Sequence, residues 1–149
     1  MNLILSVLAG RYAICRLGAN EAIPDWAQPA LSPGDAFPAW APLSNGRPGS
    51  DGRFISITRT GDELSIVCPG SFVPEAVRHD RGWRCLKVEG PLDLSLTGIL
   101  AALLAPLAEA RVNIFAVSTF DTDYLLVKDE LLSLAAETLV RAGHRIEAR

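Results

Sequence analysis

The fold is decided by the stretch from Gly82 to Val127, GWRCLKVEGPLDLSLTGILAALLAPLAEARVNIFAVSTFDTDYLLV. It opens with alternating apolar and polar residues, a pattern typical of a β-strand, and a Gly-Pro pair ends the alternation. A long apolar segment follows, for which we expect a helix over residues 95–110. Two further strands are predicted over residues 113–119 and 124–127, joined by a tight turn at residues 121–123. The stretch therefore predicts strand, helix, strand, turn and strand in that order.

The residues after this stretch predict a second helix and a final strand. Asp129 and Glu130 suit the positive end of a helix dipole, and Gly143 suits the position just beyond a helix C-terminus. A short strand from His144 to Glu147 completes the chain. Residues 81–149 are thus predicted to form a β-α-β-β-α-β domain, the ferredoxin-like arrangement of the α+β class.

The first part of the chain echoes this order only loosely. Its apolar segments predict two hairpins, one of residues 3–8 with 12–17 and one of residues 54–59 with 63–68. They also predict one short helix over residues 73–78. We therefore expect two tandem halves, with residues 1–80 as a degenerate copy of residues 81–149.

A proline-rich insertion interrupts the first half. Residues 18–52 hold six of the ten prolines, and proline fixes φ and removes a hydrogen-bond donor, so no long helix or central strand is expected there.

A four-stranded sheet with both helices on one face, as predicted for residues 81–149, leaves its other face open. A second sheet or a second subunit is the expected cover.

The composition favours a packed globular protein. Hydrophobic residues make up 49% of the chain and charged residues 21%, whereas disordered chains are poorer in apolar residues. The net charge of −3 and the scattered basic residues argue against a nucleic-acid partner. No segment approaches the ~20 apolar residues of a membrane span, and the apolar N-terminal run lacks the basic flank of a secretory signal. We expect a cytoplasmic protein without membrane or nucleic-acid partners.

Nothing in the sequence indicates catalysis. Cys15, Cys68 and Cys85 lack the spacing of a zinc site or a disulfide framework, so we expect buried free thiols. Only His79 and His144 could act as a base for a thiol nucleophile, and neither lies in a supporting motif. We expect no catalytic residue, no metal site and no cofactor. An enzyme with a polar cleft near His79 or Cys68 is kept as an alternative.

Two short stretches are able to hold a small polar ligand. Ser95-Leu96-Thr97-Gly98 is at the expected helix start, where the backbone N–H groups around Leu96 to Gly98 would lack internal partners and attract a carboxylate. Asp121-Thr122-Asp123 supplies carboxylates that could accept hydrogen bonds from an ammonium group. Each stretch also has a purely local explanation. Ser95 or Asp93 suits a helix cap, and aspartate and threonine suit a tight turn.

Three runs resemble the ACT-domain family, most closely the small tandem-ACT proteins related to an animal cytosolic arginine sensor. They are FISITRTGDELSIVCPG, GWRCLKVEGPL and TGILAALLAPLAEARVNIFAVSTFDTDYLLVKDELL, and together they cover most of residues 53–132. The resemblance implies a regulatory, non-catalytic protein that binds an amino acid or a similar small zwitterion at a domain or subunit interface. By position, the implied ligand contacts are Leu94, Ser95, Leu96, Thr97, Gly98, Phe120, Asp121, Thr122 and Asp123.

This resemblance has two limits. The animal sensor has four such domains and this chain has at most two, so a comparable interface requires a homodimer. The identity of the amino acid does not carry over. The residues leave open a second function, that of a ligand-free interaction module whose exposed sheet faces or edges bind a partner protein.

Overall fold

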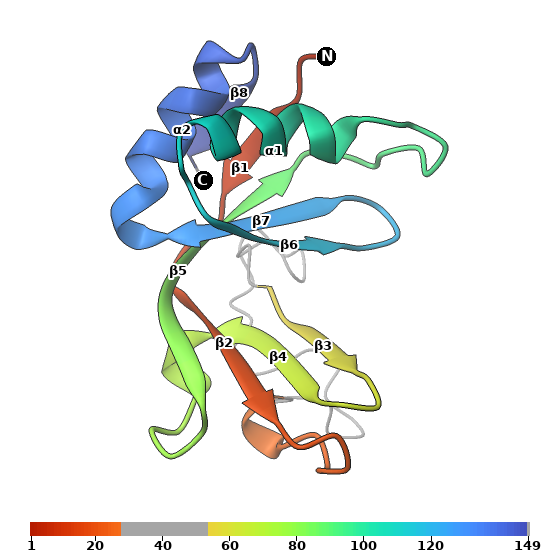
Figure 1. Cartoon of the computed structure of the whole chain (residues 1–149), viewed down its shortest axis with the longest axis vertical. Helices are drawn as coiled ribbons and strands as arrows, with labels where there is room; N and C mark the ends of the chain where they lie inside the picture. Colours follow the sequence, from red (N-terminus) through yellow and green to blue (C-terminus); the bar gives the residue numbers. More distant parts are fainter. Residues whose placement is uncertain (28–53, 149) are drawn as a thin grey trace, which may run out of the picture. The chain divides into compact units, whose positions relative to one another are not determined.

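The computed structural model describes residues 1–27 and 54–148 of the 149-residue chain. The chain folds into two compact units (Figure 1). The C-terminal unit comprises Met1–Leu8 and Trp83–Arg149, and the N-terminal unit comprises Ala9–Gly82. The first strand therefore belongs with the C-terminal segment, whereas the sequence had suggested halves divided near residue 80.

The C-terminal unit has the β-α-β-β-α-β order predicted for residues 81–149, and its ferredoxin-like α+β fold is confirmed. The 3-10 turn η3 (Asp129–Leu131) leads into its second helix. The elements are β5 (His79–Val88), α1 (Ile99–Glu109), β6 (Ile114–Ser118), β7 (Asp123–Lys128), α2 (Leu132–Arg141) and β8 (Arg145–Ala148).

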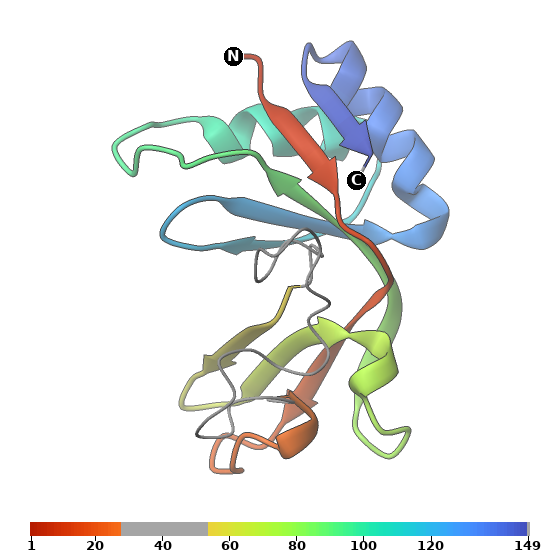
Figure 2. The ribbon, with the colours of Figure 1, turned by 180° about the vertical axis from the view of Figure 1, so that it is seen from behind.

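An additional strand, β1 (Ile4–Val7), lies between the first and last strands of this fold (Figure 2). It pairs antiparallel with β5 and parallel with β8, so the strand order in this unit is β6-β7-β5-β1-β8. The predicted hairpin of residues 3–8 with 12–17 is therefore wrong. In this position Leu5 lies opposite both Val88 and Ile146 and is completely buried. A two-stranded hairpin would give β1 a partner on only one side.

The core of the C-terminal unit lies between the sheet and its two helices. Alternate residues of the strands and one face of each helix share a single apolar cluster, whose fully buried members include Leu5, Leu86, Leu103, Leu125 and Leu139. Complete burial of a leucine side chain contributes about 1.5–3 kcal/mol. The cluster therefore fixes α1 against β5 and β7, the strands that position the site described below.

His144 connects three parts of this unit from a buried position. Its Nδ1 accepts a hydrogen bond from the Leu3 amide at 3.2 Å, and its Nε2 lies 3.2 Å from the Ala102 carbonyl oxygen. The ring thus joins the end of α2 to β1 and to α1. The Gly143 before it has φ +95°, and the amides of residues 143 and 144 bond back to α2, which ends the helix where glycine was expected.

The N-terminal unit is built from β2 (Tyr12–Leu17), β3 (Ser56–Arg59), β4 (Leu64–Pro69) and the start of β5, with 3-10 turns η1 (Asp25–Ala27) and η2 (Gly70–Phe72). The predicted hairpin of residues 54–59 with 63–68 is confirmed, because β3 and β4 pair antiparallel around Thr60-Gly61-Asp62. The predicted helix at residues 73–78 is wrong. Val73 is extended, and the only helical turn nearby is η2.

The described elements of the N-terminal unit differ from those of the C-terminal one. Within its described residues, 9–27 and 54–82, it contains no α-helix. Most of the proline-rich insertion predicted over residues 18–52 lies outside the described residues. The apolar cluster of this unit includes Cys15, Leu64, Ile66 and Cys68.

All three cysteines are buried free thiols, as predicted. Burial raises the pKa of the Cys85 thiol to about 12. The pKa of Cys68 is also raised, first by its hydrogen bond to Cys15 and then by burial. Among the described residues, no helix has both the length and the hydrophobicity needed to cross a membrane.

Candidate ligand-binding site

A cavity of about 270 Å³ lies between the segment that enters α1 and the turn that joins β6 to β7. We call it the helix-start cavity. The structure therefore brings together the two stretches singled out in the sequence, although Ser95 and Thr97 are not among the lining residues. Those residues are Leu92, Asp93, Leu94, Leu96, Gly98, Ile99, Leu100, Ser118, Thr119, Phe120, Asp121, Thr122 and Asp123.

Helix α1 begins at Ile99, four residues later than predicted. The reason is a local turn centred on Asp93, whose Oδ1 accepts hydrogen bonds from the Ser95 amide at 2.8 Å and the Ser95 hydroxyl at 2.7 Å. Such an Asx turn competes with helix formation. The same two bonds lower the pKa of the Asp93 carboxyl group. Ser95 therefore does not cap the helix.

The residue that precedes α1 is Gly98, with φ +82°. Glycine adopts this left-handed conformation without the strain that a side chain would add. The first intrahelical bond runs from the Ala102 amide to the Gly98 carbonyl at 2.9 Å. Ile99 and Leu100 line the cavity, and their amides have no partner within the helix. The sequence had placed this role on Leu96 to Gly98.

The opposite wall is a turn anchored to the sheet by Thr122. This side chain is buried, and its hydroxyl donates a 2.6 Å hydrogen bond to the Val88 carbonyl of β5. The Thr119 amide and hydroxyl both donate to the Thr122 carbonyl, at 2.8 and 3.0 Å. Thr122 thus holds the turn in place, and its hydroxyl is directed at the protein backbone.

The two walls are also joined directly. The Leu92 amide donates to the Asp121 carbonyl at 2.7 Å. A Cβ atom added at Gly90 would lie 2.9 Å from the Leu92 nitrogen, closer than real Cβ contacts, and 3.0 Å from the Asp121 oxygen, tighter than most of them. Glycine at position 90 is therefore required for this approach.

The charge around the cavity is negative. Among the described residues, the carboxylates of Asp93, Asp121 and Asp123 line it, and no lysine or arginine does. The Asp123 carboxylate accepts a 2.5 Å hydrogen bond from the Ser118 hydroxyl, which fixes its orientation. No group of three or more histidine, cysteine, aspartate or glutamate side chains in the described residues is arranged to hold a metal ion. Because these carboxylates are negatively charged, the lining suits a positively charged group on an organic ligand.

Three large apolar side chains surround the opening. Leu94 is 69% exposed, Leu96 52% and Phe120 80%. Exposed apolar residues that gather around a polar cavity commonly mark an interaction surface. Among the described residues, the lining of the cavity includes no histidine, cysteine or lysine.

The sequence missed several lining residues. Leu92, Ile99, Leu100, Ser118 and Thr119 all flank the two predicted stretches by one to three positions. Gly98 is the sequence signal that could have indicated Ile99, because glycine readily adopts positive φ and therefore often marks the boundary of an element. The pair Ser118-Thr119 just before an aspartate turn is a second such signal.

Comparison with known proteins gives the family. The ACT-domain family model matches residues 78–141, and a second model, of an N-terminal domain, matches residues 29–76. A crystal structure of a protein from Agrobacterium tumefaciens is 40% identical to this chain, with a TM-score of 0.79, and the match covers 100% of this chain and 95% of that one. The chain thus contains an ACT domain, over residues 78–141.

This ACT-domain chain is also similar to the cytosolic arginine sensor for mTORC1 subunit 1 from Bos taurus. The two are 29% identical over 103 residues, which is 60% of this chain but only 30% of the sensor. The ACT-domain chain thus spans about a third of that relative. The ligand-free regulatory subunit of aspartate kinase from Thermus thermophilus shares the fold, with a TM-score of 0.54 at 12% identity over 93% of this chain and 95% of the subunit.

Proposed function

We propose that this ACT-domain chain is a non-catalytic regulatory protein that binds an amino acid in the helix-start cavity. One observation carries the proposal. The first residues of α1 and the aspartate-bearing turn line a common cavity of about 270 Å³. One wall offers N–H donors to a carboxylate and the other offers carboxylates to an ammonium group, which matches the two charges of a zwitterion.

The ligand contacts follow from this arrangement. The α-carboxylate accepts hydrogen bonds from the amides of Ile99 and Leu100, beside Gly98, which has no side chain. The α-ammonium group donates to the Asp121 carboxylate. Hydrogen bonds of this charged kind contribute about 1.5–3 kcal/mol each. Of the positions implied by the family, Leu94, Leu96 and Phe120 provide the apolar rim, and Thr122 supports the turn.

The net charge of the cavity favours a basic amino acid. After one carboxylate has paired with the α-ammonium group, two of the three aspartates that line the cavity are left for a cationic side chain. An acidic side chain would meet repulsion instead. The name of the bovine relative, an arginine sensor, supports arginine as the first ligand to test.

A second copy of the chain completes the site in this proposal. The cavity is just below the ~300–1,000 Å³ typical of ligand pockets, and its rim is apolar and exposed. A partner chain packed on Leu94, Leu96 and Phe120 would cover the rim and exclude water. A homodimer is therefore expected in solution, and its contact should be strengthened by the ligand.

The two units have different roles in this account. Residues 81–149 act as the ligand-binding ACT domain, with strand β1 built into their sheet, and residues 9–80 act as a degenerate ACT-like domain. No cofactor takes part. The name of the bovine relative, a cytosolic sensor, supports a cytoplasmic location.

The test is a thermal-shift screen of the full chain against the twenty amino acids. A ligand at 100 times its Kd should stabilise the chain by about 2.7 kcal/mol. Asp121→Asn should abolish the response, because it removes one negative charge from the cavity. Asp62→Asn, an equal charge change in the exposed turn of the β3–β4 hairpin, should leave the response unchanged.

A ligand-free interaction module is the second candidate. The exposed side chains of Leu94, Leu96 and Phe120 favour it, because such a rim can dock a different protein without any small molecule. The screen separates the two functions. A response to no amino acid, with a purified chain that stays monomeric, supports the interaction module and rejects the amino-acid sensor.

A further inference from the structure

Two of the three buried cysteines lie together in the N-terminal unit. Cys15 is on β2 and Cys68 is on β4, and the register of these strands pairs Cys15 with Ile66 and Cys68 with Ala13. The two cysteines are therefore diagonal neighbours on one face of an antiparallel pair, because residues two positions apart in a strand point to the same side. Both belong to the apolar cluster of this unit, and their side chains hydrogen-bond to each other. We call them the thiol pair.

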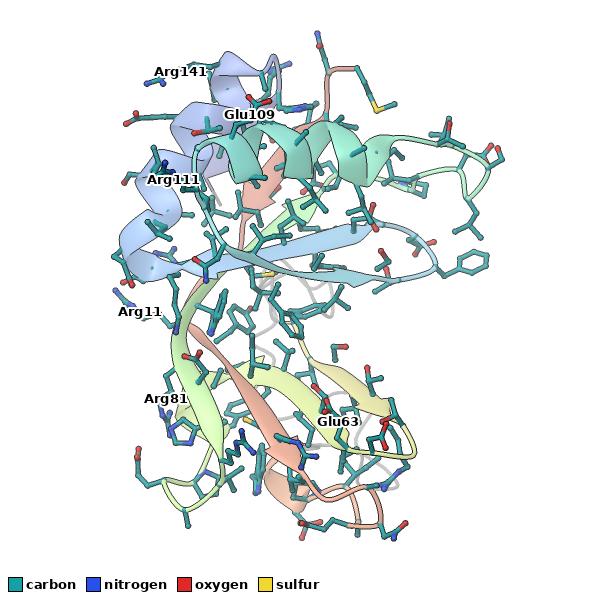
Figure 3. All side chains as sticks on the ribbon, viewed as in Figure 1. Arg11, Glu63, Arg81, Glu109, Arg111 and Arg141 are labelled. Atoms are coloured by element: carbon teal, nitrogen blue, oxygen red, sulfur yellow. The ribbon has the colours of Figure 1, made fainter. Side chains whose placement is uncertain are left out.

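The two sulfur atoms hold their protons unequally. Their mutual hydrogen bond is the main cause that lowers the pKa of Cys15 and raises the pKa of Cys68, so the Cys68 thiol donates and the Cys15 sulfur accepts. The positive charge of Arg81 lowers the pKa of both thiols. Figure 3 shows Arg81 on β5, beside the segment that follows β4, where its guanidinium group donates to the Gly70 and Val73 carbonyls. A proton between two sulfur atoms thus occupies a position that a monovalent cation can take.

The surroundings of the thiol pair select the kind of metal ion. Cys15 is 1% exposed and Cys68 is completely buried, so water is not at hand as a further ligand. Among the described residues, no third histidine, cysteine, aspartate or glutamate joins the pair in a group able to hold a metal ion. A structural zinc ion requires four ligands and is therefore excluded from this position. Thiolates select soft ions, of which Cu(I) is satisfied by two sulfur ligands.

The strand geometry favours a bridging ion over a disulfide. Diagonal neighbours in an antiparallel pair lie about 7–8 Å apart, whereas two cysteines whose Cα atoms are more than about 7 Å apart cannot be joined without backbone movement. A bridging ion replaces one sulfur–sulfur bond of about 2.05 Å by two metal–sulfur bonds of about 2.3 Å each. It therefore spans the larger gap while β2 and β4 stay paired.

We propose that the thiol pair binds one Cu(I) ion through the sulfur atoms of Cys15 and Cys68. Each thiol releases its proton to the solvent as its sulfur–copper bond forms, and copper keeps its oxidation state. One copper ion and two thiolates carry a net charge of −1, which the nearby charge of Arg81 offsets. The site is independent of the amino-acid proposal, because neither cysteine lines the helix-start cavity.

The test is a competition for Cu(I) between the full chain and the chelator bicinchoninate, under nitrogen and with ascorbate present. The copper–bicinchoninate complex is coloured, so the fall in its absorbance measures the copper that the chain withdraws. The wild-type chain should withdraw one equivalent. Cys15→Ala and Cys68→Ala should each weaken binding by about 100-fold or more, because even changes beyond the ligands cost about 10–100-fold. Cys85→Ala removes a buried thiol outside the pair and should leave the affinity unchanged.

A second measurement keeps the test valid if an alanine variant does not fold, which circular dichroism reveals. X-ray absorption of the copper-loaded wild-type chain should show two sulfur neighbours around copper and no nitrogen or oxygen neighbour. Failure of the wild-type chain to withdraw copper would overturn the proposal, as would nitrogen or oxygen neighbours at the metal. Copper binding that survives in both folded variants of the pair, or that is lost equally in Cys85→Ala, would show an adventitious ion only and would also overturn it.

Discussion

The hydrogen bond from Thr122 to Val88 provides the sharpest test of how the helix-start cavity is held together. Thr122→Val keeps the shape of the side chain but removes the hydroxyl that donates to the Val88 carbonyl at 2.6 Å. Thr122 is 5% exposed, so water cannot readily replace the lost donor. A buried carbonyl that loses its partner costs about 1–3 kcal/mol.

The free energy of unfolding can be measured by urea denaturation followed by circular dichroism. For a chain of this length, each kcal/mol lowers the melting temperature by about 2–4 °C, which gives a second readout. Thr58→Val, on the exposed face of β3, is the matched control, and its change should stay within about 0.5 kcal/mol. If the Thr122 variant is as stable as the wild-type chain, the turn is not anchored as described.

Three further predictions concern stability and reactivity. His144→Phe should destabilise the chain by about 1–3 kcal/mol in urea denaturation, because both hydrogen bonds of the buried ring are lost; an unchanged midpoint would contradict the role assigned to the ring. Gly90→Ala should cost a further ~1–3 kcal/mol through overpacking against the Asp121 carbonyl, and a neutral result in the same assay would show that the two walls can separate freely. Cys85, with a pKa of about 12, should resist iodoacetamide at pH 8 in the folded chain and react after unfolding, as mass spectrometry can follow; rapid reaction of the native thiol would refute its burial.

The order of elements in the second half was accessible from the sequence because its signals are local. The alternation from residue 83 to 88, the apolar segment that becomes α1, and Gly143 at the end of α2 each act within a few neighbouring residues. The hairpin around Thr60-Gly61-Asp62 was predictable for the same reason. Its turn residues and its alternating strands agree with each other.

The pairing of β1 was not accessible in this way. Its partners, β5 and β8, are about eighty and a hundred and forty positions away, and an apolar strand of four residues looks the same whichever strand it joins. The start of α1 was misplaced for a different reason. Ser95 resembles a helix cap, but the Asp93 carboxylate two residues earlier binds both its amide and its hydroxyl.

The candidate site was predictable in outline but not in detail. The sequence indicated the two stretches whose residues line the cavity, because helix starts and aspartate turns have recognisable chemistry. It could not show that Thr122 turns inward to bond Val88, nor that the amides of Ile99 and Leu100 replace those of residues 96–98. Both facts depend on contacts with β5 and on the exact first residue of the helix.

The amino-acid proposal is tested most directly by a titration of the ¹⁵N-labelled full chain with arginine, observed at single amides. The account predicts saturable shifts at Ile99, Leu100 and Asp121, no saturable shift at Gly70 or Gly82, and loss of the response in the Asp121→Asn variant. If neither arginine nor any of the other nineteen amino acids shifts the amides of Ile99 and Leu100, the helix-start cavity is not an amino-acid site.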